Sequence, residues 1–165
     1  MKPIIRSALC GLAAVVSVTG TAVAKPSTEI DRSPSSSASR YGVPVVLAPH
    51  PGSGTDRLAR QLMAQDIESA RKYGENPLVL TGMARLGNGK DDELLFVQLQ
   101  SASECGSAGC STVTFRRSAG GWHRILDTVS GPMQIAEARH RGMPDLIGQD
   151  GIHMIWDGSK YREIE

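Results

Sequence analysis

The sequence of 165 residues has few aromatic side chains, few cysteines and no marked excess of either charge. Phe, Trp and Tyr make up 4% of the chain, and there are three cysteines, 18 basic residues and 17 acidic residues. This balance excludes a nucleic-acid coat protein and a polybasic membrane binder, because both depend on a strongly positive surface. With so few aromatics, a small domain has few large apolar groups from which to build a core.

The N-terminus has the pattern of a secretion signal. An apolar stretch runs from Ala8 to Val18 and is preceded by the basic residues Lys2 and Arg6. It has the length of the hydrophobic region of a signal peptide and is too short to span a bilayer. Ala22-Val23-Ala24 fits the small-residue cleavage pattern, so we predict a signal peptide over residues 1–24. The alternative is a retained N-terminal membrane anchor.

Removal of this signal takes away two basic residues and Cys10, which leaves 16 basic and 17 acidic residues and a formal net charge of −1. Cys105 and Cys110 then form an even pair in an exported chain, where the oxidising compartment favours a disulfide. Gly106 and Gly109 allow a tight loop between two β-like runs, which predicts a disulfide-closed hairpin. A redox-active pair is the alternative, but the spacing differs from that of thioredoxin-like motifs.

Two further segments follow the predicted signal. Residues 25–40 are rich in serine and proline and nearly free of apolar side chains. Such a segment cannot bury enough surface to offset the entropy lost on ordering, so we predict a disordered tether. Residues 41–165 have the length of a single globular domain with one modest core.

The start of this domain predicts a strand and then a helix. A short apolar run at residues 43–47 is typical of a strand and is ended by a Pro/Gly-rich turn. Apolar residues then recur at helical spacing from Thr55 to Tyr73. Ser53, followed three positions later by Asp56, has the form of a capping box, and Gly74 is placed to end the helix.

The remainder of the domain predicts short strands separated by clusters of turn residues. The apolar runs are residues 77–80, 94–99, 111–115, 122–126, 134–136, 145–147 and 152–156. Their regular spacing predicts an α+β fold, in which an antiparallel β-meander of about six to eight short strands packs against one N-terminal amphipathic helix.

Several turns of this region resemble integrin-type FG-GAP repeats. The resemblance is carried by residues 87–96, 142–147 and 156–161. The stretch 83–161 also resembles small exported bacterial domains of unknown function that carry a Cys-Gly-Ser-Ala-Gly-Cys-like hairpin. These resemblances imply a few propeller-blade-like strands in a secreted protein, and they supply no established activity.

The FG-GAP resemblance also implies a weak calcium site, because the loops of that family often hold this ion. Arg85 and Gly89 stand where acidic ligands are expected, and calcium requires six or more oxygens. A solvated acidic turn is the alternative, since Asp and Asn are ordinary turn formers. The remaining oxygen donors are Asn88, Asp91, Asp92 and Glu93.

Residues 45–60 are similar to the start of the solute receptors of tripartite tricarboxylate transporters. Those receptors have a strand, a Pro-Gly-Gly-type loop and a helix. A loop at a helix N-terminus can present amides and hydroxyls to a carboxylate or phosphate, which makes Ser53, Gly54 and Thr55 candidates for anion binding. The mature chain is too short for a two-lobed receptor, and without a Walker lysine it has no nucleotide P-loop. An ordinary capped turn is the alternative.

Signals for catalysis are scarce. The four histidines are scattered, with no pair at helical spacing to bind zinc, and no serine stands in a nucleophile-elbow motif. The sequence therefore favours a protein that is not an enzyme and uses no cofactor. Trp122 and Trp156 are candidate interaction residues, since tryptophan is enriched in binding hot spots, and core packing is their alternative role.

These observations predict an exported, non-catalytic binding or protective module of the cell envelope, in the periplasm or secreted. The expected partner is an unidentified envelope protein, in a complex of the inhibitor or immunity type. We expect neither nucleic acid binding nor stable membrane insertion after signal cleavage. The alternative function is small-anion binding or hydrolysis at the loop Gly52–Thr55.

Overall fold

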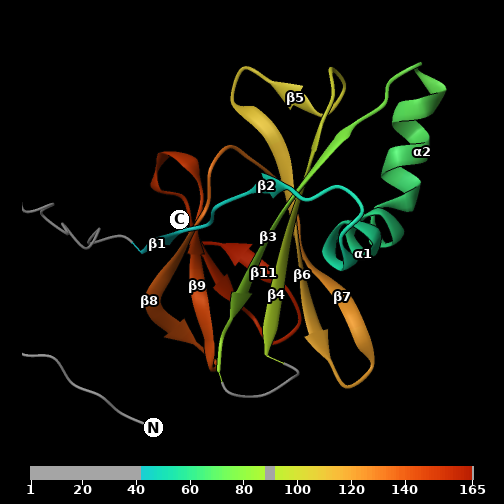
Figure 1. Ribbon diagram of the computed structural model, residues 1–165. Helices are drawn as coiled ribbons and strands as arrows, with labels where there is room; N and C mark the ends of the chain where they lie inside the picture. The colour runs from blue at the N-terminus through green and yellow to red at the C-terminus, as the bar shows by residue number, and fades with distance from the viewer. Residues whose placement is uncertain (1–41, 88–91, 165) are drawn as a thin grey trace, which may run out of the picture. The chain divides into compact units, whose positions relative to one another are not determined.

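The computed structural model describes residues 42–87 and 92–164 (Figure 1). The predicted signal peptide, residues 1–24, and the predicted tether, residues 25–40, lie outside the described residues. Within them there are two α-helices and a short 3-10 helix: α1 (Gly54–Leu62), α2 (Ala64–Lys72) and η1 (Gln149–Gly151). The strands are β1 (Val43–Pro44), β2 (Ala48–Pro49), β3 (Leu78–Arg85), β4 (Glu93–Gln100), β5 (Cys105–Gly106), β6 (Gly109–Ser118), β7 (Gly121–Ser130), β8 (Gln134–His140), β9 (Met143–Ile147), β10 (His153–Trp156) and β11 (Tyr161–Glu163).

The strands form two antiparallel sheets, which confirms the predicted α+β, strand-rich class but replaces one meander by two. Sheet I has the order β1-β8-β9-β10-β11. Sheet II has the order β2-β3-β4-β6, and both β5 and β7 pair with β6. Alternating sequence patterns show which residues share a strand face, but not to which sheet each strand belongs.

The predicted single helix over 55–73 is wrong in one respect, because the chain bends at Met63 into α1 and α2. Met63 leaves helical geometry, with φ −100° and ψ 19°, although its N–H still bonds to the Ala59 carbonyl at 2.9 Å. The side chains of Ala59, Met63 and Ile67 all pack against sheet II. The bend, visible between α1 and α2 in Figure 1, thus keeps the apolar side of both helices against a twisted sheet.

The predicted strand at 43–47 is instead a strap, Val43–Pro49, that crosses from one sheet to the other. Its first residues pair with β8 of sheet I and its last with β3 of sheet II. Between them, the Val45 N–H bonds to the Met133 carbonyl at 2.9 Å. The strap passes directly over Gly82 of β3, where an added Cβ would lie 2.7 Å from the Val46 carbonyl oxygen. Only glycine lets the two backbones approach this closely.

Strand β4 is the centre of the fold, buried along both of its faces. Leu94 and Phe96 face sheet I and join the core between the sheets. The intervening Leu95 and Val97 face the opposite way, into the core beneath the helices. Because successive strand residues alternate between faces, a strand covered on both sides has consecutive apolar residues, as at 94–97.

The structure contains the predicted hairpin and disulfide. Cys105 of β5 and Cys110 of β6 are opposite one another in the register and joined by a disulfide. Gly109 adopts φ 103°, a conformation that favours glycine. Among the described residues, no helix combines the length and the apolarity needed to cross a membrane.

Candidate functional site

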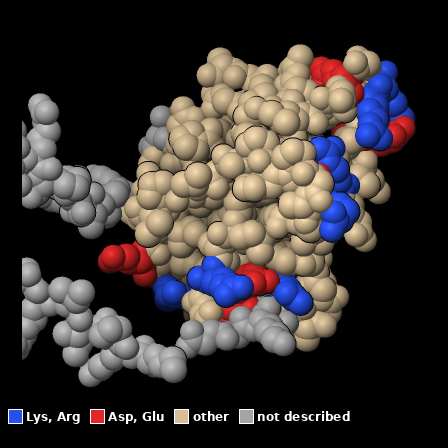
Figure 2. Space-filling view, viewed as in Figure 1, with Lys and Arg blue, Asp and Glu red and all other residues tan. Residues whose placement is uncertain are grey.

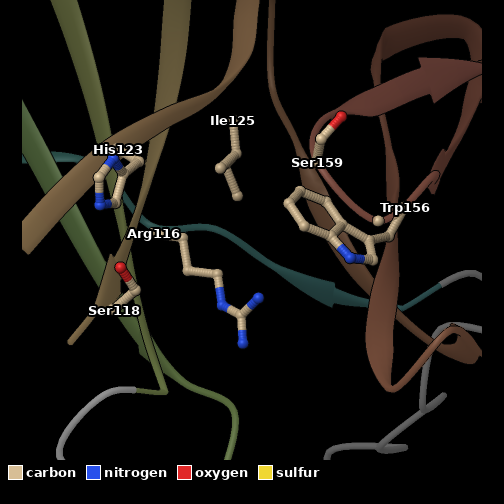
Figure 3. Close-up of a pocket in the computed structure, with 7 residues that line it drawn as sticks. Arg116, Ser118, His123, Ile125, Trp156 and Ser159 are labelled. Atoms are coloured by element: carbon tan, nitrogen blue, oxygen red, sulfur yellow. The ribbon is translucent and has the colours of Figure 1, made fainter. Parts of the chain in front are cut away.

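A cavity of about 180 Å³ lies between the two sheets, at the β6–β7 hairpin and the β10–β11 turn (Figure 3). Its lining has two large apolar groups, a guanidinium, an imidazole and two hydroxyls, and no described carboxylate is part of it. The lining residues are Arg116 and Ser118 of β6, His123 and Ile125 of β7, Trp156 of β10, and Gly158 and Ser159 of the following turn.

The pairing of β6 with β7 explains why these side chains share one wall. Arg116 is opposite His123 in the register. Ser118 lies two positions from Arg116 on β6, and Ile125 lies two positions from His123 on β7, on the other side of that pair. Residues two apart point to the same face of a sheet. Arg116 is also opposite Leu94 of β4, so the cavity begins where the apolar core between the sheets ends.

The opposite wall is fixed by a well-bonded turn between β10 and β11. The Asp157 carboxylate accepts hydrogen bonds from the backbone N–H groups of Ser159 and Lys160, each at 2.8 Å, and from the Arg162 guanidinium. The bond from Arg162 and then these backbone donors hold the pKa of Asp157 well below its ordinary value. Lys160 reaches across to Asp127 of β7 at 3.3 Å, which ties the turn to sheet II.

Arg116 is the main charged group of the cavity, and its hydrogen-bonding capacity is only partly used. Its guanidinium carbon lies 5.7 Å from the centre of the Trp156 ring, within the range of a cation–π contact. Its Nη2 lies 3.6 Å from the Asp92 carboxylate, which is longer than a hydrogen bond. Its Nε is buried and has no hydrogen-bond partner within the described part of the chain. The described chain therefore gives the guanidinium a cation–π contact and one long ion pair.

The two predicted interaction residues lie on different faces of the fold. Trp156 is 7% exposed, packs edge to face against Tyr161 at 5.5 Å, and forms a wall of the cavity. Trp122 is opposite Arg117 on β6, one residue beyond Arg116, and so packs against the core under the helices. Trp156 thus belongs to the core and also lines the cavity, while Trp122 packs against the core beneath the helices.

No family model, no curated protein and no solved structure matches this chain. The resemblances to FG-GAP repeats and to transporter receptors therefore remain predictions from short motifs.

Arg116 and His123, which line the cavity, were missed by the sequence analysis. One signal was present: Thr112, Thr114 and Arg116 give a polar face to β6, while Val113 and Phe115 give an apolar one. A polar stripe of this kind normally faces solvent. Here it faces sheet I, because the opposite face of β6 packs against the core beneath the helices. This orientation can be seen only once the positions of both sheets are known.

The predicted anion site at Ser53, Gly54 and Thr55 already holds a carboxylate of the chain. Ser53 is the N-cap of α1, and its hydroxyl accepts the Asp56 N–H at 3.0 Å. The buried Asp56 carboxylate accepts the Gly52 N–H at 3.0 Å and pairs with Arg60 at 3.0 Å. These contacts match the ordinary capped turn, which satisfies the helix N-terminus from within the chain.

We predict that Asp56→Asn lowers stability at neutral pH and that this loss disappears in acid. The Gly52 N–H, followed by Arg60, lowers the pKa of Asp56 from its ordinary value of 3.8. A carboxylate with a pKa lowered by folding stabilises the fold above its unfolded pKa, and the contribution is lost as the pH falls through the folded pKa. Urea denaturation should show a deficit of about 1 kcal/mol between about pH 5 and pH 7, shrinking below about pH 4.

The matched control for this prediction is Glu68→Gln, which neutralises an exposed carboxylate on α2. It should leave stability nearly unchanged at every pH. A deficit in Asp56→Asn that stays constant down to about pH 2 would show that the lost stability comes from shape and not from charge.

The weak calcium candidates are divided between described and undescribed residues. Asn88 and Asp91 lie outside the described residues. Asp92 lies 3.6 Å from Arg116, and Glu93 pairs with Arg85 at 3.4 Å and with Arg117 at 3.1 Å. Across residues 42–87 and 92–164, no group of three acidic, histidine or cysteine residues is placed to hold a metal ion. The described carboxylates thus have arginine partners.

A histidine–aspartate pair on sheet I was also missed by the sequence analysis. The Nδ1 of His140 on β8 lies 2.6 Å from a carboxylate oxygen of Asp145 on β9. Asp145 is 2% exposed and His140 is half exposed. A carboxylate orients histidine in this way in catalytic triads, but the described residues provide no hydroxyl or thiol bonded to His140. The pair connects the neighbouring strands β8 and β9.

Proposed function

We propose that this chain is an exported, non-catalytic binding module that takes a side chain of a protein partner into the cavity between its two sheets. The observation that carries the proposal is the Arg116 guanidinium, which lines a cavity with an apolar wall of Ile125 and Trp156. Its carboxylate neighbour within the described residues, Asp92, lies 3.6 Å away, which is longer than a hydrogen bond. A guanidinium that lines a cavity and has no close carboxylate among the described residues is suited to bind a ligand there.

The size of the cavity favours a protein partner over a small molecule. Pockets for cofactors and drug-sized ligands typically hold about 300–1,000 Å³. The cavity here holds about 180 Å³, which suits one side chain. Protein interfaces are often anchored by a single side chain that fills a pocket of this kind, surrounded by contacts of lower energy.

Export is part of the same proposal. The signal-peptide pattern at residues 1–24 and the disulfide between Cys105 and Cys110 both suit an oxidising compartment, either the periplasm or the external medium. A binding domain on an N-terminal tether, residues 25–40, suits an inhibitor or immunity protein of the cell envelope. Small-anion binding at Gly52–Thr55 is not proposed, because Asp56 occupies that helix N-terminus.

A pocket-filling variant tests the proposal. Random peptides displayed on phage would be selected against the exported chain with its disulfide intact. The selected peptides should bind Ser118→Phe at least tenfold more weakly than the wild type, because the added ring enters the cavity. Affinity would be measured by fluorescence anisotropy, after a urea unfolding curve confirms that the variant is folded.

Ser107→Phe is the matched control, since it adds the same ring at the exposed tip of the disulfide hairpin. It should leave the affinity within twofold of the wild type. If every selected peptide binds Ser118→Phe as tightly as the wild type, the cavity is not the binding site and the proposal fails.

A further inference from the structure

We infer that the side chain taken by this cavity is acidic, with its carboxylate bound by Arg116 and its stem against Ile125 and Trp156. This inference rests on the proposed function and names the chemistry of the partner. It follows from the charge of the lining, the geometry of the guanidinium and the weakness of the contact that Arg116 makes within the chain.

The lining of the cavity has a positive group and no described negative one. Arg117 pairs with Glu93 at 3.1 Å and Arg162 pairs with Asp157, whereas the ion pair of Arg116 with Asp92 is longer, at 3.6 Å. Figure 2 shows basic and acidic side chains close together along the lower edge of the view. Arg116 differs in facing a cavity, where an acidic side chain would complement it.

The guanidinium is held in place before any partner binds. It lies over the Trp156 ring, and Figure 3 shows it between this indole and the His123 imidazole. Trp156 is in turn held by Tyr161, whose hydroxyl donates to the Pro144 carbonyl at 2.6 Å. A guanidinium fixed in this way loses little freedom on binding, and its planar donors match both oxygens of a carboxylate.

Within the chain, Asp92 makes a weak ion pair with Arg116 in the place where the carboxylate of a partner would bind. It lies 3.6 Å from Nη2 of Arg116, and its side chain is 45% exposed. Partly exposed ion pairs of this length contribute little to stability, because water screens the attraction between the two charges. A partner carboxylate that makes two hydrogen bonds to the guanidinium in the cavity would therefore displace Asp92 from Arg116.

The chemistry of the remaining lining fits a carboxylate on an aliphatic stem. Ile125 and Trp156 offer apolar surface for methylene groups. The His123 ring can donate a further hydrogen bond to an oxyanion, whereas the Ser159 hydroxyl already donates to Asp157 at 2.9 Å. An apolar side chain of the same size would cover the Arg116 guanidinium without giving it a hydrogen bond, and a basic one would be repelled.

The test is a double-mutant cycle between a displayed peptide and Arg116. Peptides that depend on an open cavity should share a Glu or Asp, and changing this residue to Gln or Asn should weaken binding to the wild type at least tenfold. The same change should alter binding to Arg116→Gln by less than twofold, because the partner group is gone. Arg116→Lys, which keeps the charge without the planar fork, should give an intermediate loss.

Asp92→Asn should change the affinity for acidic peptides in the opposite direction to Arg116→Gln. Removing the internal competitor should strengthen binding of the acidic peptides about threefold, and it should not affect their Gln or Asn versions. Peptides made with a free or an amidated C-terminus distinguish a side-chain carboxylate from a terminal one. Equal binding of the two forms supports the inference, whereas dependence on the free terminus contradicts it.

The two proposals can fail separately. If Ser118→Phe abolishes binding but the shared peptide residue is apolar, aromatic or basic, the cavity is a binding site and the acidic inference is wrong. An equal loss from the Glu→Gln change on the wild type and on Arg116→Gln also contradicts it. If Ser118→Phe has no effect, the proposed function itself has failed.

Discussion

Phe96→Ala should lower the free energy of unfolding by about 3–5 kcal/mol. Phe96 is fully buried at the centre of β4 and belongs to the core between the two sheets. Its removal takes away apolar contacts and leaves a cavity that strands paired on both sides cannot collapse to fill. Since domains of this size are stable by only about 5–15 kcal/mol, the loss is a large share of the total.

Urea denaturation followed by tryptophan fluorescence would measure this change, because Trp156 lies in the same core. Phe96→Leu, which keeps most of the apolar volume, is the control and should cost about 1 kcal/mol. If alanine costs no more than leucine at this position, sheet I does not pack on β4 as described, and the cavity between the sheets loses its structural basis.

His140→Ala should lower the free energy of unfolding by about 3 kcal/mol at neutral pH. The substitution leaves Asp145, which is 2% exposed, without the imidazole that lies 2.6 Å from its carboxylate. A buried carboxylate that loses its partner bears the full cost of its removal from water. Half of His140 is exposed, so the expected value is at the lower end of the range for buried pairs.

The double variant His140→Ala/Asp145→Leu separates this effect from a simple loss of packing. It removes the buried charge together with its partner and should recover at least half of the lost stability. Both proteins would be compared by urea denaturation at the same pH. If the double variant is less stable than His140→Ala, the carboxylate has other partners that stabilise it, and the expected origin of the loss is incorrect.

The local features of the fold could be predicted from the sequence, because each depends on residues close together in the chain. The disulfide hairpin follows from two cysteines separated by a short glycine-containing loop, and the start of α1 follows from the capping pattern of Ser53 and Asp56. The bend at Met63 was not predictable in this way, since the apolar spacing continues through it. It depends on the shape of the sheet below.

The division into two sheets and the cavity between them depend on contacts between distant segments. The run 43–47 would be apolar in a single strand and is equally apolar in a segment whose two ends pair with different sheets. Its pattern therefore predicted one strand. Arg116 and Trp156 are 40 positions apart in the numbering, and no local pattern relates them. Their meeting requires the register of β6 and β10 in separate sheets, which the sequence alone does not specify.

The strap Val43–Pro49 gives the domain a defined response to mechanical force. If the chain is attached to a surface through its N-terminus, tension first reaches β1 and its pairing with β8, and then the hydrogen bond from Val45 to Met133. These contacts are few and would detach one after another before the long pairing of β3 with β4 carries any force. The strap would then detach and extend under tension, while the core and its cavity remain folded.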